Sequence, residues 1–180
     1  KLEETAWPSP LMIDGPVFVE IFDNTVWVST DGKTAHQKPI NEVDSSVWRV
    51  LEMATVVSYD VKALYHELDK QRVAVRFMSV HDLRQGAFLL DPLGRDRSIA
   101  TLVGDETTDP LAILAGLRDV YARQVEALEA EPRVREIAYE YDFPLTYTLF
   151  QIERAGVKID PEQFKKLSKE LGDEHAKLEQ

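Results

Sequence analysis

Short runs of β-branched and aromatic residues at the start of the chain are typical of strands. Residues 16–22 and 25–30 form two such runs, and Asp23-Asn24 between them has the composition of a tight turn. Strands joined by so short a connection pair in antiparallel fashion. The pattern therefore predicts that the fold begins with a β-hairpin.

Strands then alternate with helices along the chain. Two further apolar runs predict strands at 55–58 and 73–77. Apolar residues at helical spacing predict helices within 43–53, 60–72 and 81–92. This alternation is typical of an α/β layer fold with some parallel pairing of strands. We therefore predict a mixed sheet with flanking helices.

The second half of the chain is predicted to be helical. From Asp109-Pro110 onward the strand pattern disappears, and apolar residues recur at helical spacing as far as Leu128. Another helix is predicted from about Leu145 to Gly156, because glycine suits the left-handed position after a helix end. The sheet is thus followed by a helical C-terminal part.

Each end of the chain carries a local signal of its own. The first 15 residues contain two prolines and no apolar period, which predicts a linker or an edge segment. Near the other end, Asp160-Pro161 supplies an N-cap and an N1 proline for a last helix. An apolar stripe that needs a partner runs along this helix, through Phe164, Leu167, Leu171 and Leu178.

Composition narrows the classes of function. Lys and Arg total 21 against 32 Asp and Glu, a net charge of 21 − 32 = −11 that repels a phosphate backbone and disfavours an autonomous nucleic-acid binder. A module of a larger protein that carries its basic channel elsewhere stays possible, as does a nuclease whose acidic site is neutralised by metal. Without cysteine there is no disulfide, thiolate metal site or Cys nucleophile.

The location expected of the chain follows from two missing patterns. No apolar run approaches the length of a membrane span, and the first residues lack the stages of a signal peptide. We therefore expect a cytoplasmic location and no membrane partner.

One string of residues near the end of the chain combines a predicted helix, its glycine end and the start of the next helix. It contains Pro144, Leu145, Ile152, Glu153, Arg154, Gly156, Val157, Ile159 and Asp160. This string closely resembles the entry to the polymerase domain in family A DNA polymerases, where a helix that begins Pro-Leu ends in Glu-Arg-x-Gly-Val. Upstream, residues 56–68 resemble the segment that carries the second exonuclease motif of these polymerases, and 81–92 resemble the helix that follows it. Asp60 then matches the second-motif aspartate, and Asp82 opens the next helix.

The resemblance implies a part of a bacterial DNA polymerase I used in DNA replication and repair. Residues 1–15 would be a linker or edge segment, 16–143 a 3′-5′ exonuclease-like domain with a ribonuclease H-like fold, and 144–180 the start of the polymerase thumb. Its partner would be the rest of the same polymerase chain. DNA would be bound through that parent polymerase, weakly or not at all by this fragment. The parent nucleotidyltransferase would need Mg²⁺, and this domain would hold no cofactor.

The same resemblance implies that the exonuclease chemistry is lost. Nucleases of this class hold two divalent cations with carboxylates, and Mg²⁺ requires oxygen ligands. The first-motif Asp falls on Ile21, the first-motif Glu on Asp23, and the third-motif Asp on or near Leu117. Asp60 alone plainly survives, and an Asp directly after a strand is also a common helix N-cap. We therefore predict a degenerate, inactive exonuclease domain without catalytic or metal-binding residues.

Two other functions stay open at this point. The domain could be an active metal-dependent 3′-5′ proofreading exonuclease with Glu20 or Asp23, Asp60 and Asp119 as metal ligands. It could also be a stand-alone interaction module related to RNase D-like nucleases.

Other conspicuous residues are given structural interpretations. The pair His81-Asp82 is interpreted as a helix N-terminal cap, and Trp27 and Trp48 as core aromatics.

Overall fold

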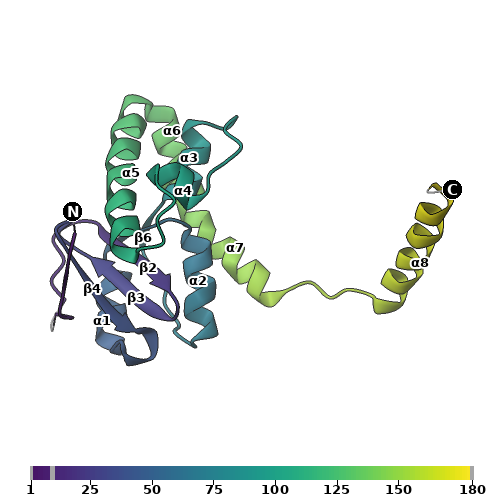
Figure 1. The fold of residues 1–180 in the computed structure, drawn as a ribbon, viewed down its shortest axis with the longest axis horizontal. Coiled ribbons are helices and arrows are strands. Elements are labelled where there is room, and N and C mark those ends of the chain that lie inside the picture. Colours follow the sequence, from purple (N-terminus) through teal and green to yellow (C-terminus); the bar gives the residue numbers. More distant parts are fainter. Residues whose placement is uncertain (1, 9–10, 179–180) are drawn as a thin grey trace. The chain divides into compact units, whose positions relative to one another are not determined.

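The computed structural model describes residues 2–8 and 11–178, which form two compact units, one up to Phe150 and one from Gln151 onward. In the described part of the first unit, six strands form one mixed sheet in the order β1-β4-β3-β2-β5-β6. Figure 1 shows the sheet with helices beside it. Their bounds are Glu3–Thr5 (β1), Val17–Phe22 (β2), Thr25–Ser29 (β3), Thr34–Pro39 (β4), Thr55–Ser58 (β5) and Ser79–Asp82 (β6).

The predicted hairpin is confirmed. Strands β2 and β3 pair in antiparallel fashion, and the turn residues Asp23 and Asn24 have φ angles of 47° and 60°. A two-residue turn that continues the twist of its strands needs positive φ at both positions, which Asp and Asn tolerate.

Two strands extend the hairpin on the β3 side. The polar strand β4, which the sequence pattern did not predict, pairs antiparallel with β3. Strand β1 pairs parallel with β4, so the described part of the predicted linker or edge segment includes an edge strand. Lys1, Ser9 and Pro10 of that segment lie outside the described residues.

Strands β5 and β6 extend the sheet on the other side, both in parallel pairing. The prediction of a strand at 73–77 is wrong, because β6 begins only at Ser79. Val75 and Phe77 are buried while Arg76 between them is exposed, so the alternation is real. The backbone N–H of Phe77 donates to the Tyr65 hydroxyl, 3.1 Å away, and the segment forms no strand pairing.

Helices of the first compact unit flank the sheet, as predicted. The α-helices are Ser45–Glu52 (α1), Val61–Lys70 (α2), Leu83–Leu90 (α3), Ile99–Val103 (α4), Pro110–Ala130 (α5), Pro132–Ile137 (α6), Phe143–Ala155 (α7) and Pro161–Leu178 (α8). A short 3₁₀ turn covers Ile40–Glu42, and a π-helical turn covers Ala138–Asp142 between α6 and α7. The mixed α/β architecture and the helical C-terminal part are therefore both present.

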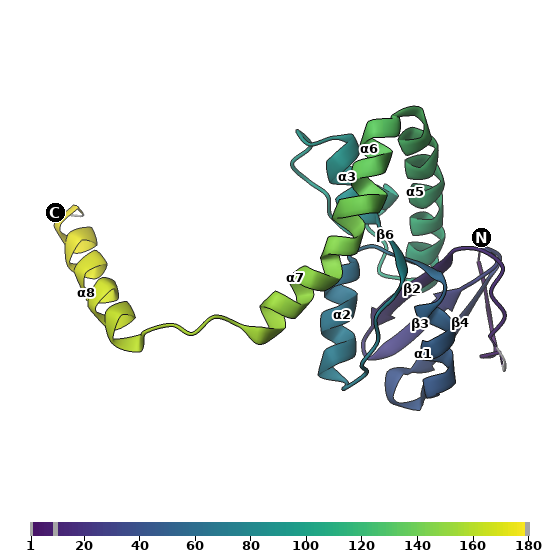
Figure 2. The ribbon, with the colours of Figure 1, turned by 180° about the vertical axis from the view of Figure 1, so that it is seen from behind.

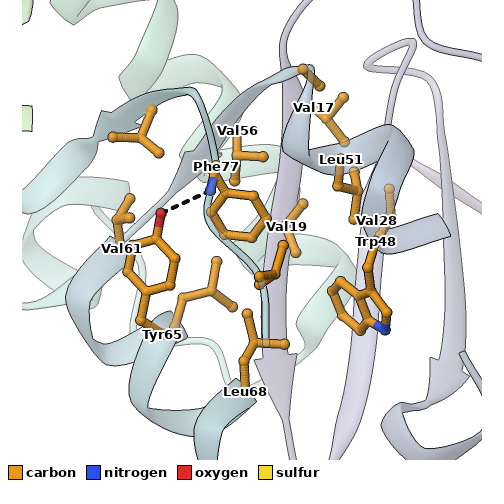
Figure 3. Packing of buried hydrophobic residues seen from close by; sticks show 14 of the residues in the cluster. Val17, Val19, Val28, Trp48, Leu51, Val56, Val61, Tyr65, Leu68 and Phe77 are labelled. Atoms are coloured by element: carbon orange, nitrogen blue, oxygen red, sulfur yellow. Dashed lines mark hydrogen bonds between the residues drawn. The ribbon is translucent and has the colours of Figure 1, made fainter. Parts of the chain in front are cut away.

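One face of the sheet packs against α1 and α2 (Figures 2 and 3). Val19 and Val56 from the strands face Leu51 of α1 and Leu68 of α2, all fully buried or nearly so. Removing each such side chain from water contributes about 1.5–3 kcal/mol. Trp48 of α1 is also buried here, as expected of a core aromatic.

The opposite face of the sheet packs against α5. Phe18 of β2 and Val57 of β5 contact a cluster that includes Ile113, Leu117 and Val120 of this helix. Ile113, Leu117 and Val120 lie four and three positions apart, so they share the side of the helix that is buried against the sheet. The sheet is therefore covered on both faces.

The first compact unit extends into α7. Phe143 and Phe150 are buried, and the ring of Phe150 stacks on that of Tyr65 in α2, with centroids 5.4 Å apart. The domain boundary before Pro144 stays a prediction, but the residues just after it pack against the α/β part. This packing arises because the apolar side of α7 continues past Pro144.

The second unit contains the predicted last helix. Gly156 has a φ of 70°, as expected after a helix end, and Asp160 caps α8 by accepting from the backbone N–H of Glu162 at 3.0 Å. The apolar stripe of α8 is exposed, with Phe164 and Leu171 each 57% accessible. Among the described residues, no helix is long and apolar enough to cross a membrane.

Candidate functional site

Three carboxylates lie at one edge of the sheet. Glu20 is on β2, Asp60 lies two residues after the end of β5, and Asp82 is the last residue of β6. Because β2, β5 and β6 are parallel neighbours, their carboxyl ends share this edge. The carboxylates are close enough that Asp60 and Asp82 each help to raise the pKa of Glu20. We call Glu20, Asp60 and Asp82 the carboxylate cluster.

Asp60, the residue that matches the second exonuclease motif, has both carboxylate oxygens engaged. Its Oδ1 accepts from the backbone N–H of Ala63 at 2.9 Å, which makes it the N-cap of α2. Its Oδ2 accepts from Nη1 of Arg84 at 2.8 Å, and the Asp60 side chain is 16% exposed. The guanidinium neutralises the charge that a metal ion would otherwise meet.

Glu20 clamps the turn between β5 and α2. Its Oε1 accepts from the Ser58 hydroxyl at 3.0 Å and from the backbone N–H of Tyr59 at 2.5 Å. Burial raises the pKa of Glu20 to about 7, against the lowering effect of these two hydrogen bonds. Since strand side chains alternate, Glu20 faces away from Ile21, as the sequence predicted.

Asp82 joins two helix starts. Its Oδ1 accepts from the backbone N–H of Gln85 at 2.8 Å and thereby caps α3, as expected for an Asp that opens this helix. Its Oδ2 accepts from the backbone N–H of Val61 at 2.8 Å, at the first residue of α2. Burial raises the pKa of Asp82 to about 7. The carboxylate cluster therefore caps helices and clamps the strand–helix junctions.

The other predicted exonuclease positions do not join the carboxylate cluster. Ile21 packs, partly buried, on the face that holds α1 and α2, and Asp23 is exposed in the hairpin turn. Leu117 is 1% exposed in the cluster around Phe18. Asp119, a ligand in the active-exonuclease alternative, is exposed and pairs with Arg118.

The chemistry of this edge does not suit a divalent cation. In the part of the chain that the structure describes, no group of three or more His, Asp or Glu side chains is arranged to hold a metal ion. A cavity of about 270 Å³ opens beside Asp60 and Asp82, and Lys62, Arg84 and Arg97 line it too. Three cationic side chains beside two carboxylates oppose the entry of Mg²⁺. The residues present do not fit the two-metal site of an exonuclease.

A buried hydrogen-bond network lies behind Asp82. His81 is fully buried; its Nε2 lies 2.9 Å from Oε1 of Gln124, and its Nδ1 lies 2.9 Å from the hydroxyl of Tyr139. The amide Nε2 of Gln124 donates to the carbonyl of Leu83, so its Oε1 is the atom that accepts from His81. The proton of His81 is thus on Nε2, and Tyr139 donates to Nδ1.

The surroundings of His81 keep its ring neutral. Burial lowers the pKa of His81 to about 4. Gly86 of α3 lets Gln124 approach, since a Cβ there would lie 2.4 Å from the Gln124 Oε1. The sequence interpretation of His81 as part of a cap is wrong, because only Asp82 caps α3. Gln124 within the apolar stripe of α5 was the available signal for a buried polar partner.

The residues of the predicted thumb-entry motif lie at the end of α7 and beyond it. Glu153 and Arg154 are exposed in the last turn of α7, and Val157 is exposed after Gly156. Asp160 is the α8 cap described above. These residues form the end of one helix and the start of the next, and their side chains are exposed.

Comparisons with known proteins show the fold. No protein-family model matches the chain, and no curated protein matches it. Among solved structures, 45 chains match. One is the POL domain of Pol1 from M. smegmatis, in complex with a DNA primer-template and dNTP. The TM-score is 0.71 at 15% identity, and the match covers 87% of this chain but 31% of that one. The chain thus spans about a third of the length of that polymerase chain, and it shares the fold of the matched part.

Proposed function

We propose that the chain is a degenerate 3′-5′ exonuclease-like domain that serves as a structural part of a DNA polymerase I in DNA replication and repair. The domain itself is catalytically inactive. Template-directed nucleotidyl transfer, with its Mg²⁺, belongs to other parts of the parent polymerase, through which DNA is bound. The segment from Pro144 onward is the start of the thumb.

The fold supports this proposal at two levels. The order β4-β3-β2-β5-β6, with β3 alone antiparallel to its neighbours, is the strand arrangement expected of a ribonuclease H-like sheet. The match to a DNA polymerase over 87% of this chain supports a polymerase as the parent protein. Fold alone does not fix activity, so the argument for inactivity comes from the site.

The state of Asp60 carries the proposal of inactivity. This residue matches a metal ligand of the exonucleases. One of its carboxylate oxygens accepts the hydrogen bond that caps α2, and the other accepts from Arg84. The positions that should supply its co-ligands are the apolar Ile21 and Leu117. One carboxylate already neutralised by a guanidinium cannot hold two divalent cations.

A nuclease assay tests the proposal directly. End-labelled single-stranded DNA is incubated with the purified chain in Mg²⁺ and then in Mn²⁺, beside an Asp60→Ala variant prepared in the same way. We expect no degradation above the background common to both preparations. Activity that follows the wild-type protein through purification and disappears in Asp60→Ala would refute the proposal.

One observation favours the alternative of an active proofreading exonuclease. Glu20, Asp60 and Asp82 share one sheet edge, and Asp60 adds to the raised pKa of both other residues. Closely placed carboxylates that raise one another's pKa are also found where a cation is bound. Calorimetric titration with Mn²⁺ separates the two functions: we expect no saturable binding, whereas binding that Glu20→Gln abolishes would support the alternative.

A further inference from the structure

A second cavity lies away from the carboxylate cluster. It has a volume of about 390 Å³ and lies among α2, residues 76–80 and residues 139–147. Ser79 and Val80, at the start of β6, line it, whereas Asp82 of the carboxylate cluster is at the end of that strand. We call it the aromatic cavity.

Arg76 is the one charged residue among the described residues that line the aromatic cavity. Its guanidinium carbon lies 5.0 Å from the centroid of the Tyr147 ring. It forms no ion pair or hydrogen bond within the described part of the chain, although acidic residues outnumber basic ones by 32 to 21. A guanidinium held against a ring, with its donors unused, is suited to binding an anion.

The walls of the aromatic cavity are flat rings held by one another. Tyr65 stacks on Phe77 with centroids 5.2 Å apart, and Tyr147 meets Tyr65 edge-on at 5.1 Å. Tyr139 and Phe143 form another edge-to-face pair, at 5.2 Å. A planar ligand can therefore contact these rings without first ordering them.

Two hydroxyl groups add hydrogen-bonding capacity. The Tyr65 oxygen accepts from the Phe77 N–H, and among the described residues no atom accepts the Tyr65 proton. Burial raises the pKa of Tyr65 to about 12, so this proton stays in place. Ser79, which accepts from Thr55, also lines the cavity and keeps its own proton to donate.

We propose that the aromatic cavity binds a small planar aromatic anion, with its ring against the aromatic walls and its carboxylate or phosphate on Arg76. The volume lies within the range of about 300–1,000 Å³ that is usual for small-molecule sites, which are mostly apolar with a few placed polar groups. The positive charge of Arg76, with no carboxylate beside it on the cavity wall, selects for an anion. This inference does not depend on the proposed polymerase function.

The experiment measures binding of defined probes to the 180-residue chain by NMR chemical-shift titration. Adenosine 5′-monophosphate represents an aromatic phosphate and 1-naphthoate an aromatic carboxylate. Adenosine and 1-naphthalenemethanol are their uncharged counterparts, and inorganic phosphate is the anion alone. We expect at least one aromatic anion to bind about tenfold more tightly than both its uncharged counterpart and inorganic phosphate, and to shift the amides of Phe77 and Tyr147.

Variants locate the site. Arg76→Gln should weaken binding of that anion about tenfold, because it removes the charge-assisted contact. Arg95→Gln, which removes the same charge from an exposed position outside the cavity, should leave binding unchanged. Since Arg76 is exposed, its replacement should not unfold the chain, and a melting curve checks this. Failure of both aromatic anions to bind at millimolar concentration, or equal binding by Arg76→Gln, overturns the proposal.

Discussion

The imidazole of His81 donates its Nε2 proton to the side-chain oxygen of Gln124, 2.9 Å away, where the end of β6 meets α5. Its other nitrogen accepts from Tyr139, in the π-helical turn before α7. One buried ring therefore connects the sheet with two helical segments far from it in sequence. The stability of the first compact unit should depend on this connection.

Replacing His81 by Phe tests that dependence. The Phe ring can fill the site, but Gln124 and Tyr139 lose a buried partner, so the free energy of unfolding should fall by about 2–4 kcal/mol. Urea denaturation at neutral pH measures it. Adding Gln124→Leu should recover part of the loss, because the buried amide oxygen that lost its donor is then gone, while the Tyr139 hydroxyl still lacks its acceptor. An unchanged stability in His81→Phe would show that the network contributes nothing.

The pH dependence of His81 has a definite sign. Its folded-state pKa of about 4 lies below the ordinary value of 6.5. Its contribution is therefore fully present above pH 6.5 and is lost as the pH falls toward 4, since only the unfolded chain takes up the proton in this window. We expect the NMR signals of the His81 ring to show no titration between pH 8 and pH 5. A midpoint above pH 6 would contradict the burial that the structure shows.

The contribution of Glu20 to stability should change with pH in the opposite direction to that of His81. Its folded-state pKa of about 7 lies above the ordinary value of 4.5, so its contribution is complete below pH 4.5 and is lost as the pH rises through 7. Glu20→Gln keeps an oxygen for the Tyr59 N–H and removes the charge. The variant should be more stable than wild type by about 1–3 kcal/mol at pH 8, and equal to it near pH 4.5.

The comparison is made by thermal and urea unfolding at both pH values. Glu126→Gln, an exposed change of the same chemical kind, serves as the control and should alter stability little at either pH. Because each variant is compared with wild type at the same pH, the contribution of His81 cancels. A Glu20→Gln variant that is less stable at pH 8 would mean that the ionised carboxylate stabilises the fold.

Restoring carboxylates at the lost exonuclease positions should not restore cleavage. Ile21→Asp and Leu117→Asp place charges in apolar packing, and for Leu117, which is 1% exposed, the loss of stability should reach about 3–5 kcal/mol. Melting curves and the Mn²⁺ nuclease assay are read together, with Ile21→Val as the packing control. A double variant that keeps its melting temperature and degrades DNA would show that a working site was still available.

Two truncations should behave differently. A chain that ends at Phe150 keeps the contacts of Tyr147 and Phe150 with Tyr65, and should melt at the wild-type temperature. A chain that ends at Phe143 loses both rings and should be less stable by about 2–4 kcal/mol. Circular dichroism melts measure both. Equal melting temperatures would show that the contacts of Tyr147 and Phe150 with Tyr65 do not stabilise the first compact unit.

The exposed stripe of α8 should bind apolar probes. Phe164→Ser with Leu167→Ser should lower the fluorescence of a bound naphthalene sulfonate dye without changing the melting temperature, because both side chains are more than half exposed. Glu162→Ser, on the same helix, is the control. A fall in melting temperature in the double variant would show that the stripe is packed in solution.

Local patterns predicted the elements that local chemistry determines. Asp23-Asn24 favours a positive-φ turn whatever surrounds it, and Asp160-Pro161 starts a helix through its own hydrogen bonds. Strand β4 could not be predicted in this way, since its polar residues become a strand through pairing with β3 and β1. Residues 73–77 show the reverse case. Their burial alternates as in a strand, but they pair with no strand.

The candidate site was predictable to the same extent. Asp60 and Asp82 each cap the helix that begins at the next residue, by accepting from a backbone N–H three positions on, and such caps are visible in sequence. Glu20 contacts Ser58 across 38 positions, and His81 contacts Gln124 across 43. No period or spacing encodes pairings of this length, because they exist only once the strands have been ordered into a sheet.

Strand β1 gives the sheet a short and charged border. It has three residues, all exposed, and two of them are Glu3 and Glu4. Unpaired backbone groups on a long apolar border strand would invite a second molecule to add its own strand, which is how many sheet proteins begin to aggregate. If two copies of β1 paired, their glutamates would lie close together and repel. A strand of three residues forms too few hydrogen bonds to offset that repulsion. The protein therefore carries its own protection against fibre-like self-association at this border.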